Sequence, residues 1–170
     1  LLLESGAEVN QPDEDGVTPL FIASQKGQTD TARLLLESGA DVNQATNYGH
    51  TSLYYASLNG HTDTARLLLE SGADVNQATN YGYTPLSIVS QEGHTDTTRL
   101  LLESGANVNQ ADNDGRTPLF YASQEGHIDV LELLLKSGAN VEMVVHSGRH
   151  QGKTAMDVIC QYNRANQHNR

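Results

Sequence analysis

Three histidines recur at a constant interval and are the first residues in the chain whose type and spacing suggest chemistry. His61, His94 and His127 stand 33 residues apart, and imidazole is a common zinc ligand. Ligands of one zinc ion lie about 2 Å from the metal, whereas packed helices lie about 8 to 10 Å apart. Because successive units could not easily share one ion, we interpret the three histidines as structural and predict no metal site.

Acidic residues recur at the same interval and raise the question of acid–base catalysis. The glutamates concerned are Glu4, Glu37, Glu70 and Glu103. Paired catalytic carboxylates lie about 5 to 9 Å apart around a pocket. Glutamates that recur once in every unit are better explained as part of a solvent-exposed face of the stack. The glycine-rich turns contain neither GxxxxGK[ST] nor GxGxxG, the patterns that cradle phosphates. We therefore expect no catalytic residue and no cofactor.

The charge of the chain and its single cysteine narrow the classes of partner and compartment. A net charge of −11 without a basic stripe argues against nucleic-acid binding. Cys160 cannot form an internal disulfide, which favours an intracellular, cytoplasmic protein, with the nucleus an open alternative. A secreted protein with few cysteines could also contain a single one, so that alternative stays open. Cys160 stands beside Val158 and Ile159 and has no basic neighbour in the preceding turn, so we interpret it as a packed hydrophobe.

The opening leucines give way to polar residues at Glu4, so the sequence predicts neither a signal-peptide core nor membrane insertion.

A long internal repeat reveals the organisation of the chain. The residues LLLESGADVNQATNYG occur at 34–49 and again, letter for letter, at 67–82. Shorter copies, LLLESGA or LLLKSGA, begin at Leu1, Leu34, Leu67, Leu100 and Leu133, always 33 residues apart. A fixed period of this length is typical of solenoids, in which each unit buries its apolar face against the next.

One period, 46–78, contains the signals for two short helices. Thr51 is a good N-cap, and the equivalent threonines of the other units are followed by Pro at the first helical position. A second helix should begin near Thr62, with Asp63 in its first turn, and end at Gly72. Helices of about ten residues are marginal alone in water, so each must stack on a neighbour. The following run, ADVNQATNYGH, has no helical period and predicts an extended turn or hairpin.

Four copies of one motif stand in register along the chain. TPLFIAS, TSLYYAS, TPLSIVS and TPLFYAS are each followed by Gly, by HTD or a near variant, by LLLESGA or LLLKSGA, and by DVN or a variant of it. In these residues the chain resembles ankyrin repeats, whose period is also about 33 residues. The resemblance implies an all-α fold, an ankyrin-repeat solenoid of stacked helix-turn-helix units joined by short β-hairpin-like turns. It also implies that His61 and its equivalents fix the turns between helices.

The same resemblance divides the chain into units. We expect one domain over 1–170, with a truncated repeat at 1–12, full repeats at 13–45, 46–78, 79–111 and 112–144, and a C-terminal capping repeat at 145–170. About four extra residues stand in the loop HSGRHQGK before the last helix, TAMDVICQYNR, and its polar end, ANQHNR. We expect the C-terminus to be a genuine end. Because the chain begins within a helical pattern at Leu1, we expect its N-terminus to be a cut through a longer protein.

Two departures from the family pattern bear on stability. The family places His after TPL, where it ties neighbouring loops together, and we expect that polar network to be missing because the residues here are Phe21, Tyr54, Ser87 and Phe120. Paired aliphatics of the second helix are retained at Val130-Leu131 but replaced at Thr31-Ala32, Thr64-Ala65 and Thr97-Thr98. Buried threonine hydroxyls need partners and contribute less apolar area. We therefore predict that unit 79–111 is the least stable.

Two sets of positions vary while the frame stays constant, namely the tip of the turn before each TPL motif and the end of each first helix. In proteins similar to this one, these positions line the concave face that grips partners, although variable tips can also be unconstrained solvent positions. The resemblance implies a candidate binding surface of Asp15, Lys26, Tyr48, His50, Leu58, Asn59, Tyr81, Tyr83, Glu92, Asp114, Arg116 and Glu125. Tyrosine is a preferred interface anchor. Acidic tips at 13–15, and at Asp112 and Asp114, predict a salt-sensitive encounter with a basic partner.

The sequence thus predicts a non-catalytic protein–protein interaction module or scaffold, a monomer whose partner is another protein with a basic patch. The main alternative is a regulatory or adaptor arm of a longer enzyme, channel or effector whose active part precedes Leu1. A purely structural spacer is the remaining alternative. Asn43, Asn76 and Asn109 are similar to the asparagines that hydroxylases modify in this family, although Asx-type hydrogen bonds that brace the loop are sufficient to explain them.

Overall fold

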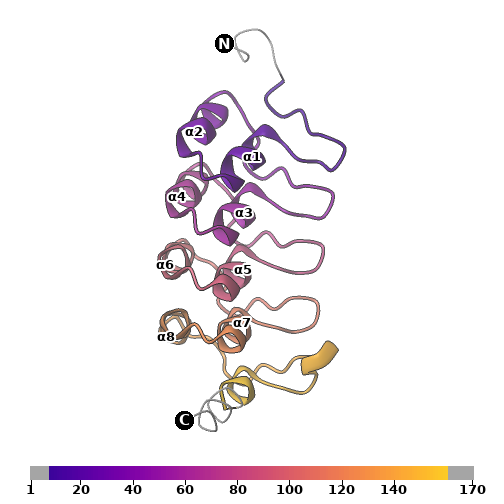
Figure 1. Ribbon diagram of the computed structural model, residues 1–170, viewed down its shortest axis with the longest axis vertical. Helices are drawn as coiled ribbons and strands as arrows, with labels where there is room; N and C mark the ends of the chain where they lie inside the picture. Colours follow the sequence, from indigo (N-terminus) through magenta and orange to yellow (C-terminus); the bar gives the residue numbers. More distant parts are fainter. Residues whose placement is uncertain (1–7, 161–170) are drawn as a thin grey trace.

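The computed structural model describes residues 8–160 and shows a stack of helix-turn-helix layers (Figure 1). The first and second helices of the layers form two parallel columns, and a hairpin projects from each layer toward the same side. The leucines at 1–3, where the chain begins, and the polar end at 165–170 lie outside the described residues.

The order of the elements follows the 33-residue period. The first helices are α1 (Pro19–Gln25), α3 (Ser52–Leu58), α5 (Pro85–Glu92) and α7 (Pro118–Glu125). The second helices are α2 (Thr29–Glu37), α4 (Thr62–Glu70), α6 (Thr95–Glu103) and α8 (Ile128–Lys136). A 3-10 helix, η1 (Gly148–His150), precedes a last helix that occupies 155–160. Between residues 8 and 160 there is no β-strand, which confirms the predicted all-α solenoid.

Threonine side chains set the start of each first helix, as predicted. Thr51 Oγ1 accepts the N–H of Tyr54 at 3.1 Å, and the threonines of the other three full units cap their helices in the same way. In α5 the cap is reciprocal, because Ser87 Oγ also accepts the N–H of Thr84 at 2.8 Å. Where the family has His, this chain therefore has one local capping pair and three buried rings, those of Phe21, Tyr54 and Phe120.

One apolar core runs between the two helix columns through the described layers. The first helices contribute Leu20, Leu53, Leu86 and Leu119, each 1% exposed. The second helices contribute the equivalent buried residues Leu35, Leu68, Leu101 and Leu134. Since all belong to one continuous cluster, each added unit extends the core with the same contacts.

Hydroxyl groups pair between layers along the second-helix column. Thr29 Oγ1 lies 2.8 Å from Thr64 Oγ1, and Thr62 Oγ1 lies 2.7 Å from Thr97 Oγ1. These hydrogen bonds satisfy the buried threonines that replace aliphatic residues in the middle units. In the last full unit the position of Thr97 is taken by Val130, which has no hydroxyl, and the series ends there.

Asparagine side chains bridge successive layers beyond the second helices. Asn43 Nδ2 donates to the Gly72 carbonyl at 3.2 Å, while Asn43 Oδ1 accepts the N–H of Asp74 at 2.8 Å. The same pair of bonds recurs at Asn10, Asn76 and Asn109. These asparagines therefore brace the loop of the next unit, whereas the Asx-type bond within the loop is made by Asp41, which accepts the N–H of Asn43.

The extra residues of the last unit lie at the tip of its hairpin. In a regular hairpin the closing residues are four apart, as where the Thr46 N–H donates to the His50 carbonyl at 2.9 Å. In the cap they are eight apart, because the Val145 N–H donates to the Lys153 carbonyl at 3.0 Å. The longer tip contains η1 and reaches back to the preceding hairpin, where the His146 N–H donates to the Asp114 carbonyl at 2.7 Å.

Candidate functional site

The three regularly spaced histidines join neighbouring layers. His94 Nε2 lies 3.1 Å from the Leu58 carbonyl oxygen of the preceding unit, and its ring lies against Gly60. His61 and His127 make the equivalent contacts one layer before and one layer after. The histidines thus have the structural role that the family resemblance implied. Within residues 8–160, no group of three or more His, Cys, Asp or Glu side chains is arranged to hold a metal.

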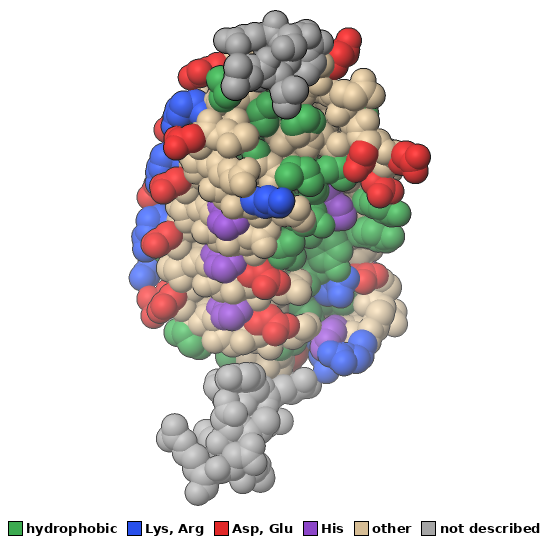
Figure 2. Space-filling model, turned by 45° about the horizontal axis from the view of Figure 1, so that its top comes forward, with side chains coloured by type: hydrophobic (Ala, Val, Ile, Leu, Met, Phe, Trp, Pro, Cys, Tyr) green, Lys and Arg blue, Asp and Glu red, His purple; other side chains and the backbone are tan. Residues whose placement is uncertain are grey.

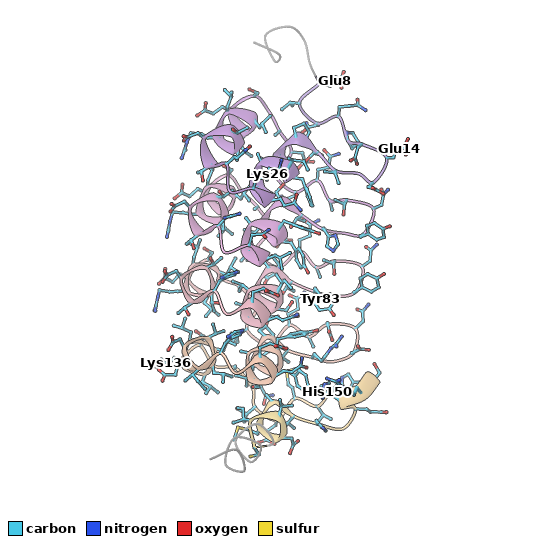
Figure 3. All side chains as sticks on the ribbon, in the orientation of Figure 1. Glu8, Glu14, Lys26, Tyr83, Lys136 and His150 are labelled. Carbon is cyan, nitrogen blue, oxygen red and sulfur yellow. The ribbon has the colours of Figure 1, made fainter. Side chains whose placement is uncertain are left out.

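The positions predicted to bind a partner lie along the hairpin tips and the ends of the first helices (Figure 3). Seven of them are exposed, namely Asp15, Lys26, Tyr48, Asn59, Tyr81, Glu92 and Glu125. The other five are half-buried, namely His50, Leu58, Tyr83, Asp114 and Arg116. The exposed residues are available for contact without rearrangement, whereas the half-buried ones already contact their neighbours.

The second hairpin holds two rings at its tip. The turn at 46–49 closes through the Gly49 N–H, which donates to the Thr46 carbonyl at 2.8 Å, and Gly49 takes the left-handed φ of 80°. Tyr48, the outermost ring, is 52% exposed. His50 turns back toward α3, where it stacks on Tyr54 with ring centroids 5.1 Å apart. Burial lowers the pKa of His50, so the ring is held in its neutral form near neutral pH.

Aromatic contacts continue from this hairpin across the first helices. Tyr55 of α3 meets His50 edge-on at 5.4 Å and Phe21 of α1 at 4.7 Å between centroids. Burial, followed by the charges of Tyr55, Tyr83 and Glu92, raises the pKa of Tyr54 to about 12. Tyr54 and Tyr55 also meet edge-on, with ring centroids 5.7 Å apart.

A network of polar groups supports the hairpin of the fourth full unit. Arg116 Nε lies 2.9 Å from Asp112 Oδ2, and Arg116 Nη2 lies 2.7 Å from Asp114 Oδ2. The guanidinium group lies 5.5 Å from the centre of the Tyr121 ring, and Tyr121 donates its hydroxyl to Asp112. Burial and this hydrogen bond raise the pKa of Tyr121. Arg116 Nη2 also lies 3.4 Å from the Tyr83 hydroxyl, which joins the network to the preceding hairpin.

The prediction that Asp112 forms part of an acidic rim is wrong. Asp112 is 7% exposed, and its carboxylate is bound by Arg116 and Tyr121. A buried carboxylate needs a cation or hydrogen-bond donors, and this chain supplies both. Asp114 is half-buried and accepts hydrogen bonds from Arg116 and from the Ser147 hydroxyl, so its charge is shared with the protein.

An open groove of about 380 Å³ lies between the third and fourth full hairpins. It is lined by Tyr81, Tyr83, Asn113, Asp114 and Arg116. Tyr81 is 61% exposed and forms the outer wall, whereas Arg116 is fixed by its ion pairs. The groove therefore combines a large apolar ring with polar groups that are already oriented.

Sequence reasoning missed two side chains of this surface and one that is buried beneath it, Tyr121. Ile22, Tyr55 and Tyr121 occupy one position of α1, α3 and α7, next to the residue that replaces the family's His. Ile22 is 38% exposed, and Tyr55 and Tyr121 contact the aromatic residues of the hairpins. The alternation of Ile and Tyr at this position was a signal that comparison of the four units could have found.

Tyr48, His50, Tyr54, Tyr55, Tyr81, Tyr83 and Tyr121 together form what we call the aromatic patch. Figure 2 shows hydrophobic side chains gathered in one area of the surface, bordered by charged side chains of both signs. Exposed apolar area of this kind, rimmed by polar groups, is typical of an interaction site.

Comparison with known families agrees with the fold. A family model for ankyrin repeats (3 copies) matches residues 1–79, 75–145 and 112–166. The matches cover nearly the whole chain, which therefore belongs to the ankyrin repeat family. Ankyrin repeats are generally protein–protein interaction modules. None of the curated proteins compared with the chain matches it. Within residues 8–160, no helix has the length and apolar character needed to span a bilayer.

Proposed function

We propose that the chain is a non-catalytic, monomeric protein-binding module that holds a partner protein against its hairpin tips and first helices. The observation that carries the proposal is the aromatic patch, in which Tyr48 and Tyr81 stay more than half exposed. Tyrosine offers a large contact area with little rotamer entropy to lose, and it is enriched at binding hot spots.

The frame beneath the patch supports a preorganised binding surface. The Asn80 N–H donates to the Tyr48 carbonyl at 3.0 Å, and Asn80 Nδ2 donates to the Asn47 carbonyl at 3.0 Å. One unit later, Asn113 makes the same two bonds to the hairpin before its own, with its N–H donating to the Tyr81 carbonyl and its Nδ2 donating to the Asn80 carbonyl. Because each tip is tied to the one before it, less conformational entropy is lost when a partner binds.

Charge at one end of the patch favours a partner with a basic surface. The tip of the first full hairpin carries three exposed carboxylates in succession, at Asp13, Glu14 and Asp15. Asp13 Oδ1 accepts the N–H of Val17 at 2.8 Å and shapes the turn. Exposed charges of this kind raise association rates with partners of opposite charge and lose their effect as salt increases.

A lysate pull-down with the parent chain and a triple variant, Tyr48→Ala, Tyr81→Ala and Tyr83→Ala, tests the proposal. The matched control removes exposed apolar side chains from the second helices, with Leu34→Ala and Leu135→Ala, which are 56% and 47% exposed in the parent. Circular dichroism must first show equal helix content in all three proteins. We expect a protein captured by the parent and by the control to be lost from the triple variant.

The opposite pattern would contradict the proposed function. Capture that survives the tyrosine substitutions but fails in the leucine control would place binding on the second helices. If nothing is captured by folded parent protein, a spacer role would explain the chain better.

We also propose that the protein acts inside the cell, in the cytoplasm. Cys160 is free and exposed, so the interpretation of this residue as a packed hydrophobe is wrong, because the side chain lies on the outer face of the last helix. A free, exposed thiol persists in a reducing compartment. Fractionation of cells that produce the native protein should recover it with cytosolic markers, and recovery from the medium would contradict this.

A further inference from the structure

Charged residues border the aromatic patch along two edges. The hairpin edge begins with Asp13, Glu14 and Asp15 and ends at the loop 145–153, which carries Arg149 and Lys153 and has no carboxylate. The helix edge, formed where the first helices end, has the opposite order, with Lys26 after α1 and Glu92 and Glu125 at the ends of α5 and α7. Each acidic group therefore lies diagonally across the patch from the other. Figure 3 labels Glu14 on the first hairpin tip and Lys26 at the end of α1.

Both acidic groups adjoin the patch. On the hairpin edge, the Asp15 carbonyl accepts the N–H of Asn47 at 3.0 Å, so the first tip lies beside the tip that carries Tyr48. On the helix edge, Glu92 is the last residue of α5, which packs against α3, the helix that carries Tyr54 and Tyr55. A partner that covers the aromatic rings would therefore reach both groups.

The acidic diagonal is the stronger of the two. It has five carboxylates, those of residues 13–15, Glu92 and Glu125, in a chain with a formal charge of −11. The other diagonal has three cations, at Lys26, Arg149 and Lys153. Arg116, which lies between them, is already paired with Asp112 and Asp114 and contributes little attraction for an anion.

From this arrangement we infer that the patch takes a partner segment that is basic at both ends and apolar in the middle. The inference rests on the proposed function and adds the path and the charge pattern of the partner. The segment crosses the face diagonally, with one basic end on the first hairpin tip and the other on Glu92 and Glu125, and its apolar centre on the tyrosines. Three layer spacings of about 8 to 10 Å give a rise of roughly 25 to 30 Å along the stack, and the step from the hairpin edge to the helix edge makes the diagonal path longer.

Synthetic peptides of about 30 residues measure about 45 Å as a helix and more when extended, which allows for the diagonal. Three peptides share one apolar centre and differ in their ends, which are basic at both ends, acidic at both ends, or basic at one end and acidic at the other. Fluorescence anisotropy with the full chain measures their affinities. We expect the peptide with two basic ends to bind on the order of tenfold more tightly than either of the others at low salt.

Charge reversals identify the two contacts separately. One variant carries Glu14→Lys and Asp15→Lys, and leaves Asp13 in place because its carboxylate shapes the turn. A second carries Glu92→Lys and Glu125→Lys. The control carries Glu37→Lys and Glu103→Lys, exposed residues at the ends of α2 and α6 in the other helix column, with the same change in net charge. Each test variant should weaken the peptide with two basic ends about five- to tenfold relative to that control.

Several outcomes would overturn the inference and leave the proposed function intact. One is tighter binding of the peptide with mixed or acidic ends. Another is a partner whose capture depends on Tyr48, Tyr81 and Tyr83 but survives both pairs of charge reversals. A dimer of the parent in sedimentation, abolished by Glu14→Lys and Asp15→Lys, would assign the patch to a second copy of the chain and would contradict the proposed monomer as well. If capture of the partner does not depend on Tyr48, Tyr81 and Tyr83, the result would instead contradict the proposed function itself.

Discussion

The ring of His94 fills the space that a side chain on Gly60 would need. A Cβ on Gly60 would lie 2.7 Å from His94 Nδ1, while Nε2 of the same ring lies 3.1 Å from the Leu58 carbonyl oxygen. The contact requires the absence of a side chain in one unit and an imidazole in the next, and it recurs at Gly27 with His61 and at Gly93 with His127.

Gly60→Ala should therefore destabilise the chain more than Gly72→Ala. Both glycines have positive φ, 67° and 90°, so alanine costs about 1 to 2 kcal/mol at either site. At Gly60 the displaced imidazole adds about 0.5 to 1.5 kcal/mol for its lost hydrogen bond, whereas no atom lies within 4 Å of a Cβ on Gly72. Urea unfolding measures both free energies. Equal losses would show that the ring moves aside without cost.

Thr62→Val should destabilise the chain more than Thr95→Val. Thr62 Oγ1 lies 2.7 Å from Oγ1 of the buried Thr97, and its removal leaves that hydroxyl without this partner, at a cost of about 1 to 3 kcal/mol. Thr95 has the same place in the next unit, where the facing position is Val130, and its replacement should change stability by less than about 0.5 kcal/mol. Thermal unfolding under matched conditions tests the difference, and similar losses in both variants would argue against the threonine pairing.

Ser57→Ala should be neutral or stabilising, in contrast to Ser90→Ala. The Ser57 hydroxyl is buried and has no hydrogen-bond partner among the described residues, whereas Ser90 Oγ donates to the Leu86 carbonyl at 2.6 Å. Removing an unsatisfied hydroxyl should gain up to about 1 kcal/mol, and removing a satisfied one should lose about 0.5 to 1.5 kcal/mol. Denaturant midpoints compare the two variants directly. A clear loss of stability on Ser57→Ala would mean that its hydroxyl has a partner in solution.

His50 should make the chain less stable in mild acid. Burial lowers the pKa of His50 below its ordinary 6.5, so the unfolded chain takes up a proton at a higher pH than the folded chain does. Its contribution to stability is full above about pH 6.5 and is lost as the pH falls from there toward the lowered pKa. His50→Tyr, which copies Tyr83 at the equivalent position, should therefore lose less stability between about pH 7.5 and pH 5.5.

Unfolding free energies of the parent and of His50→Tyr at the two pH values test this prediction. His150, whose pKa is also lowered by burial and then by nearby cations, is present in both proteins and cancels in the comparison. An identical loss in parent and variant would mean that His50 is protonated as easily in the folded state as in the unfolded state.

Unit 79–111 should exchange its amide hydrogens faster than unit 112–144. The second helix of the former has Thr97 and Thr98 where α8 has the buried apolar pair Val130 and Leu131, so less apolar area stabilises it. The hydrogen bonds of Thr97 and Thr98 satisfy their hydroxyls but do not replace that area. Hydrogen exchange followed by mass spectrometry measures protection in α6 and α8. Equal protection would show that hydroxyl pairing compensates in full.

Within the candidate site, sequence reasoning succeeded where the position in the unit decides exposure. Tyr48 and Tyr81 stand at hairpin tips, and a tip projects from the stack whatever its neighbours are, so both were correctly expected on the surface. Asp112 was misjudged because its burial depends on Arg116 and Tyr121. These residues follow it by four and nine positions and meet it only when the hairpin folds against α7.

The sequence by itself determined the period, the all-α solenoid and the limits of most helices. Those features depend on local chemistry, such as the threonine caps, the proline after Thr18 and the glycines that follow each second helix. Only the tertiary structure decided which groups meet between layers, among them Thr62 with Thr97, Asn43 with Gly72, and Arg116 with Tyr83. The physical reason is that contacts across about one period depend on the rotation and separation of rigid layers, which the packing of the whole core sets and no local spacing encodes.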